Sequence, residues 1–193
     1  MKTKVFAAFV IAGAVAFSAC NKKVDEKTMA DLNQFTTDWT AMGEKESSWS
    51  QQLVETTQHA KEFATKQNEM MNNMSTSKDE NMKSKMQEMT KTANDNVASL
   101  ESIVTEWNTF KTTWDENTTA YTEWQSKVTK GEVTSEEVEK GLADWRTKMT
   151  EAQQKMDSWN TAYMTTKETC DKNMAESNEM SKSMTTPSTP VKK

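Results

Sequence analysis

Large apolar side chains recur at intervals of three and four residues in the stretch VASLESIVTEWNTFKTTW, residues 97–114. Side chains with this spacing fall on one face of an α-helix, and a sustained repeat of it is the heptad pattern of coiled coils. Between Cys20 and Pro187 there is no proline, and the only glycines are Gly43, Gly131 and Gly141. The stretch therefore predicts a long helix that packs one face against neighbouring helices.

The same pattern continues in both directions and defines three helical segments, at about 27–74, 78–129 and 135–181. Each would be on the order of 70 Å long at 1.5 Å per residue. Polar residues Glu46, Thr56 and Gln67 interrupt the first apolar series. The predicted core positions are Leu32, Phe35, Trp39, Met42, Trp49, Leu53, Ala60, Phe63, Met70 and Met74 in the first segment, Met82, Met86, Met89, Ala93, Val97, Leu100, Ile103, Trp107, Phe110, Trp114, Tyr121, Trp124 and Val128 in the second, and Val138, Leu142, Trp145, Met149, Ala152, Met156, Trp159, Tyr163 and Cys170 in the third.

Capping signals lie where the segments meet. Ser77 with Glu80, and Thr134 with Glu137, have the spacing of a capping box, in which hydroxyl and carboxylate satisfy free N–H groups at a helix start. Gly131 suits the left-handed position just past a helix end. These signals predict two short connections, and short connections make neighbouring helices antiparallel.

The tryptophans test this arrangement. If the chain folds back near Ser77 and again near Gly131, six tryptophans gather in two layers, Trp39 with Trp114 and Trp145, and Trp49 with Trp107 and Trp159. We therefore predict an all-α fold, an elongated antiparallel (up-down-up) three-helix bundle with coiled-coil-like packing, similar in shape to a spectrin repeat.

Composition agrees with a narrow core. Only 34% of the residues are hydrophobic and the mean hydropathy is -0.89, but seven Trp, six Phe and 15 Met are too many large apolar side chains for a disordered chain. The net charge of -5 becomes more negative if Lys2 and Lys4 are removed with a signal peptide. Such a surface disfavours nucleic acid as a partner.

The first 20 residues have the pattern of an export signal. Lys2 and Lys4 precede an apolar run, and the run ends in Phe17-Ser18-Ala19-Cys20. This ending resembles the lipobox of bacterial lipoproteins. The resemblance implies cleavage before Cys20, a diacylglyceride on its thiol and a fatty acid such as palmitate on its new amino group. Asn21 is not the acidic residue associated with inner-membrane retention, so the resemblance favours the outer membrane and leaves the membrane face open.

The resulting division of the chain is a signal peptide at 1–19, a lipidated cysteine with a short linker at 20–26, and the three-helix bundle at 27–181. Residues 182–193 are rich in Ser, Thr, Pro and Lys, which predicts a disordered tail.

Catalytic patterns are absent from the sequence. His59 is the single histidine and is expected on a helix surface, and there is no phosphate-binding glycine loop, paired-cysteine metal motif or nucleophile turn. Cys170 occupies a core position as a small hydrophobic residue, with an intermolecular disulfide as the alternative. We therefore expect no enzyme activity and no cofactor other than the lipid on Cys20.

Methionines concentrate around the first predicted turn. They are Met70, Met71, Met74, Met82, Met86 and Met89, and an up-down-up bundle brings Met174, Met180 and Met184 to the same end, away from the lipid. Three interpretations stand: flexible core packing, an adaptable surface for a partner, and a soft-metal site. Thioethers prefer Cu(I) or Ag(I), and Met70, Met74, Met82 and Met86 are the candidate ligands.

These features predict a membrane-anchored, non-enzymatic helical interaction or spacer module of the bacterial envelope, with a protein partner there. The alternative function is periplasmic capture of Cu(I) or Ag(I) at the methionine-rich tip. The general layout also resembles murein (Braun-type) lipoprotein, whose terminal lysine is joined to peptidoglycan. That resemblance implies Lys193 as an attachment point, with a solvated lysine tail as the alternative.

Overall fold

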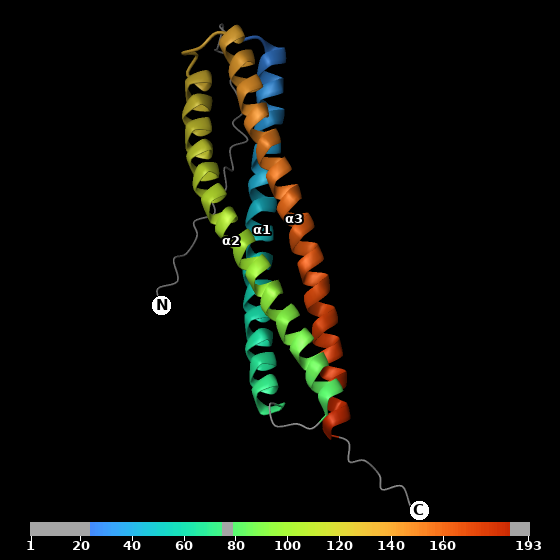
Figure 1. The fold of residues 1–193 in the computed structure, drawn as a ribbon. Helices are drawn as coiled ribbons and strands as arrows, with labels where there is room; N and C mark the ends of the chain where they lie inside the picture. The colour runs from blue at the N-terminus through green and yellow to red at the C-terminus, as the bar shows by residue number, and fades with distance from the viewer. Residues whose placement is uncertain (1–23, 75–78, 186–193) are drawn as a thin grey trace, which may run out of the picture. The chain divides into compact units, whose positions relative to one another are not determined.

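The computed structural model describes residues 24–74 and 79–185, and these form an all-α three-helix bundle without strands (Figure 1). The helices are α1 (Glu26–Asn73), α2 (Glu80–Thr129) and α3 (Ser135–Thr185). The predicted fold class is confirmed. The helix bounds lie within a few residues of the predicted ones, with the largest difference at the end of α3.

The chain divides into two compact units, each with a segment of every helix. The first unit comprises Met1–Lys45 and Asp115–Ala152, and the second comprises Glu46–Trp114 and Gln153–Lys193, in each case as far as the structure describes them.

Hydrogen bonds fix the helix directions within each unit. In the first unit, bonds between α1 and α3 join residues 110 and 111 positions apart, so the two helices are parallel. Bonds between α1 and α2 in that unit span 85 positions at one level and 79 at the next, which is the pattern of antiparallel helices. The second unit has the same helix directions. Hydrogen-bonded residues of α1 and α3 are 107 to 111 positions apart in the sequence, whereas those of α1 and α2 are 57 positions apart at one level and 26 at another.

The core of the first unit is aromatic. Tyr121 is fully buried, and its ring centroid lies 5.1 Å from Trp39, 5.5 Å from Phe35 and 5.5 Å from Trp145. Trp39 and Trp145 also meet edge to face at 5.7 Å, as predicted. The tyrosine hydroxyl is 2.7 Å from Thr36 Oγ1, so its polar end is satisfied. Tyr121 thus holds the centre of this layer.

The second unit contains the other predicted layer. The ring centroids of Trp49, Trp107 and Trp159 lie 4.9, 5.8 and 6.4 Å apart, which confirms the prediction. Trp107 Nε1 donates to Ser50 Oγ, so its ring can be buried without an unmet donor. Trp114 also belongs to this unit, where it stacks on Phe110 at 6.2 Å.

The turn between α2 and α3 has the predicted capping chemistry. Gly131 has a φ of 70°, and the N–H groups of Gly131 and Glu132 donate to the carbonyls of Val128 and Lys127, which makes a Schellman motif. Thr134 N donates to Glu137 Oε2 at 2.7 Å, and Glu137 N donates to Thr134 Oγ1 at 3.4 Å. These bonds form the predicted capping box.

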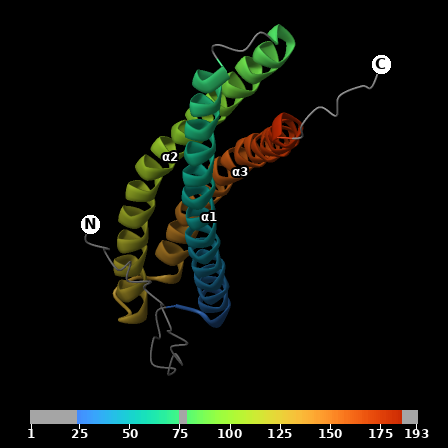
Figure 2. The ribbon, with the colours of Figure 1, turned by 90° about the horizontal axis from the view of Figure 1, so that it is seen from below.

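The other two helices begin at aspartates. Asp25 Oδ1 accepts from Thr28 N at 2.9 Å at the start of α1, and Asp79 Oδ1 accepts from Met82 N at 3.0 Å at the start of α2. Ser77, the predicted cap for α2, lies outside the described residues. Asp25 also ties α1 to α3, because its backbone N–H donates to Ser135 Oγ. In Figure 1 and Figure 2 the start of α1, in blue, accordingly lies beside the turn between α2 and α3.

Candidate functional site

A cluster of seven methionines occupies one end of the second unit. Met86, Met89 and Met180 form its buried core, and the partly buried Met70, Met71, Met74 and Met82 pack against them. All three helices contribute, since the cluster joins the end of α1, the start of α2 and the last part of α3. The four predicted metal ligands, Met70, Met74, Met82 and Met86, therefore lie in one cluster. We refer to these seven residues as the methionine cluster.

Burial separates the methionines into two groups. Met86 is fully enclosed, and Met89 and Met180 are 4% and 8% exposed, whereas Met70, Met71, Met74 and Met82 retain solvent contact. A thioether that reaches solvent can meet an ion without opening the bundle. Met86 is thus placed to pack the core, although the sequence gives no way to distinguish it from the other three candidates.

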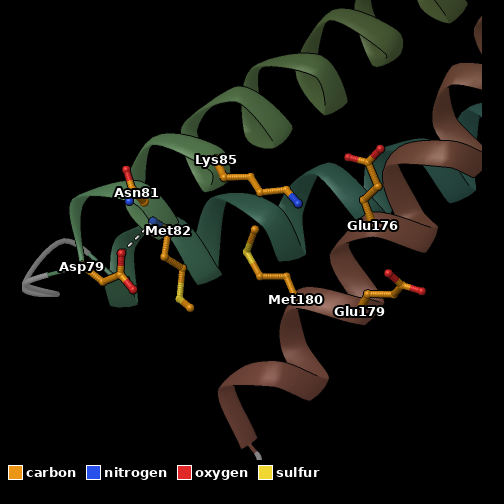
Figure 3. A pocket seen from close by; sticks show the side chains of 7 residues that line it. All are labelled: Asp79, Asn81, Met82, Lys85, Glu176, Glu179 and Met180. Atoms are coloured by element: carbon orange, nitrogen blue, oxygen red, sulfur yellow. Dashed lines mark hydrogen bonds between the residues drawn. The ribbon is translucent and has the colours of Figure 1, made fainter.

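An open hollow between α2 and α3 adjoins the methionine cluster (Figure 3). Met82 from α2 and Met180 from α3 extend into the space between the two helices. The residues that line the hollow are Asp79, Asn81, Met82, Lys85, Glu176, Glu179 and Met180. Because three carboxylates and one ammonium group line it, the hollow favours cations over anions.

From α1, the partly buried Met70 packs against the buried core that contains Met180. Ser181 Oγ donates to Met70 Sδ at 3.8 Å, and Ser181 directly follows Met180 in α3. Each helix therefore contributes one methionine to this part of the methionine cluster, namely Met70, Met82 and Met180, and of these Met82 and Met180 line the hollow.

A buried polar layer borders the methionine cluster. Gln67 is 0% exposed and its Nε2 donates to the buried Ser177 Oγ. Asn173 Nδ2 donates to the Met89 carbonyl at 2.9 Å, and Thr90 Oγ1 donates to the Gln67 carbonyl at 3.5 Å. Gln67 Oε1 has no hydrogen-bond partner among the described residues. The bundle thus changes from an aromatic to a polar interior as the methionine cluster is approached.

The remaining candidate residues do not join this site. His59 is exposed on α1, as predicted. Cys170 is 3% exposed and forms no disulfide, and burial raises the pKa of its thiol above the usual 9.0. Met174 is half-buried and is not part of the methionine cluster, and the side chain of Met184 is not described.

Two predicted attachment points, Cys20 and Lys193, lie outside the described residues, together with the signal peptide and most of the tail. Across residues 24–74 and 79–185, no helix carries a stretch apolar enough to cross a lipid bilayer. The same residues contain no group of three or more His, Cys, Asp or Glu side chains suited to a metal ion.

Comparison of the chain with protein-family models, curated proteins and solved structures gave no match.

Sequence reasoning missed the hollow and the polar layer. Met180 was expected at this end of the bundle but not as a hollow-lining residue beside Met82. The interruption of the heptad series at Gln67 was a signal of the polar layer. Its partner Ser177 is 110 residues away, so nothing local in the sequence pairs the two.

Proposed function

We propose that this chain is a lipid-anchored, non-enzymatic helical interaction or spacer module of the bacterial envelope, held in the membrane through Cys20. The sequence supports the anchor through the lipobox-like Phe17-Ser18-Ala19-Cys20. Two or more acyl chains on one residue give a lasting tether, whereas a single chain binds reversibly. The outer membrane is the proposed site.

The observation that carries the proposal is that hydrogen bonds attach the start of α1 to the start of α3. Asp25 caps the helix through Thr28, and its backbone N–H donates to Ser135 Oγ at 2.9 Å. Thr28 Oγ1 is also within 3.4 Å of Glu139 Oε1. The segment from Cys20 to Asp25 spans at most roughly 20 Å when fully extended. A lipid on Cys20 would therefore hold the folded body close to the membrane surface, as suits a module that presents a surface at a set height.

Mass spectrometry of the mature protein tests the anchor. The expected mass is that of residues 20–193 plus a diacylglyceride and one further acyl chain. Cys20→Ser should abolish both cleavage and lipid addition. Cys170→Ser is the matched control, because it removes the other cysteine and should leave lipidation intact. An unmodified Cys20 in the mature protein, or a mature form that begins elsewhere, would overturn the proposal.

Crosslinking in intact envelopes tests the interaction role. A module with a protein partner should yield a defined crosslinked species, which the Cys20→Ser variant should lose because it no longer reaches the membrane. Attachment to peptidoglycan through Lys193 would instead appear as protein that detergent releases only after muramidase digestion, and deletion of Lys193 should remove that fraction. If neither species forms and envelope integrity is unchanged without the protein, the interaction and spacer roles fail.

A further inference from the structure

We propose that the methionine cluster binds one soft monovalent cation, Cu(I) or Ag(I), through the thioethers of Met70, Met82 and Met180. This inference stands on the cluster alone and is independent of the lipid anchor. It also revises the four ligands expected from the sequence, because Met180 replaces the fully buried Met86 and Met74 is kept only as a neighbouring methionine.

The first argument is convergence. The three methionines come from three different helices and share one cluster, in which Met82 and Met180 line the hollow and Met70 packs against the same buried core as Met82. Met71 and Met74 pack against the same core and supply further sulfur atoms nearby. Thioethers are soft ligands, which favour Cu(I) and its analogue Ag(I) over the hard divalent ions.

The second argument is the choice of methionine. Leucine packs a helical core as well as methionine does, and exchanging the two usually costs less than about 1.5 kcal/mol. Elsewhere in the second unit the large buried core residues are mainly Leu53, Leu100, Ile103 and aromatic rings, with Met156 as the one buried methionine outside the cluster among the described residues of that unit. At this end every apolar member of the cluster is methionine. Packing alone does not require methionine at any of these positions, whereas the proposed site requires it at three of the seven.

The third argument is access and charge. The hollow is open to solvent and both methionines line it, so an ion that enters meets the partly exposed Met82 first and then Met180, which is 8% exposed. Asp79, Glu176 and Glu179 line it against the single Lys85, and this balance attracts a cation. The carboxylates raise the local cation concentration, while the sulfur atoms provide the selectivity.

The test is titration of the protein with Ag(I), which mimics Cu(I) without redox chemistry, and then with Cu(I) under a competing chelator. All proteins carry Cys20→Ser and Cys170→Ala, so that neither cysteine can bind the metal and the result does not depend on lipidation. The site variant is Met70→Leu/Met82→Leu/Met180→Leu. The control is Met149→Leu/Met156→Leu/Met164→Leu, which removes the same number of thioethers at half-buried, buried and exposed positions away from the cluster.

We expect one equivalent of Ag(I) to bind the parent protein and the control, and the site variant to lose that binding. With ¹³C-methyl methionine, the resonances of Met70, Met82 and Met180 should shift on Ag(I) addition, while that of Met42 should not. Circular dichroism melts establish that both triple variants are folded. No binding by the parent, or equal binding by both variants, would overturn the inference and assign the cluster to packing. That failure would leave the mass of the lipidated Cys20 unaffected, so the two proposals are tested separately.

Discussion

At the scale of single residues, two glycines with the same appearance in the sequence have opposite roles. A Cβ built on Gly141 would lie 2.6 Å from Trp124 Cζ2, whereas one built on Gly43 meets nothing within 4 Å. The absence of a side chain at Gly141 therefore lets the Trp124 ring pack against the α3 backbone. Gly43 makes no such space for a neighbour and only lowers the helix propensity of α1. The sequence marks both as helix-weakening residues, and only the fold shows that one of them makes room for a ring on another helix.

This difference predicts opposite effects of the same substitution. Gly141→Ala should lower the free energy of unfolding by about 1–3 kcal/mol, because the indole must shift. Gly43→Ala should raise it by roughly 0.5–1 kcal/mol, because alanine costs less backbone entropy in a helix. Urea unfolding followed by circular dichroism measures both. Equal effects of the two changes would show that the Trp124 contact does not exist in solution.

Asp25 predicts a specific acid sensitivity. Hydrogen bonds from Thr28 and Ser135 lower the pKa of its carboxyl from 3.8 to about 2. Because the folded-state pKa is below the unfolded value, the carboxylate stabilises the fold fully above about pH 3.8, and this contribution disappears as the pH falls towards 2. Asp25→Asn keeps a capping side chain without the charge.

Unfolding midpoints measured between pH 5 and pH 2 should therefore fall more steeply for the parent than for Asp25→Asn. The difference between the two proteins isolates Asp25 from the other carboxylates, which titrate in both. Parallel curves would mean that the cap does not depend on the charge.

At the scale of the helices, the heptad spacing predicted most of the buried positions, although Thr57 and Ala64 are buried where Thr56 and Phe63 were predicted. Glu46 and Gln67 are buried at core positions, and Thr56 Oγ1 is 2.8 Å from the Tyr163 hydroxyl. Spacing fixes the face because it depends on residues three and four apart. Spacing does not reveal the partners, because Thr56 and Gln67 bond to α3 residues 107 and 110 positions away.

The Gln67–Ser177 pair predicts a non-additive double substitution across α1 and α3. Ser177→Ala alone should cost about 1–3 kcal/mol, because it leaves the buried Gln67 amide without its acceptor. Gln67→Met/Ser177→Ala should recover most of that loss, since neither buried polar group then remains. Thermal unfolding of the two single variants and the double variant gives the coupling energy. Additive effects would show that the pair is hydrated or open in solution.

At the scale of the whole molecule, only 34% of the residues are hydrophobic, and each helix buries a narrow stripe of side chains. The types of residue in this stripe change along the helices. In the second unit the stripe runs from a cluster of interlocked rings to polar side chains and then to methionines. The sequence predicted both the tryptophan layer and the concentration of methionine, because each residue type is visible by itself. The burial of Met86 and the solvent access of Met82 depend on neighbours from other helices, and so required the fold.

This change in the stripe predicts uneven local stability within the second unit. Aromatic layers are held by large rigid contacts, whereas methionines are flexible and the Gln67 Oε1 atom has no hydrogen-bond partner within residues 24–74 and 79–185. Backbone amides around Gln67 and Ser177 should therefore exchange with deuterium faster than those around Trp49 and Trp107, by on the order of tenfold for each 1.4 kcal/mol of difference in opening free energy. If Met70, Met82 and Met180 bind Ag(I), saturation with the ion should slow exchange near Gln67 and leave the tryptophan layer unchanged, because a ligand stabilises the state that binds it. Uniform exchange along the unit, before and after the ion is added, would show that the methionine cluster is as firmly packed as the rings. It would also show that the cluster does not unfold locally, so that ion binding has no local opening to suppress.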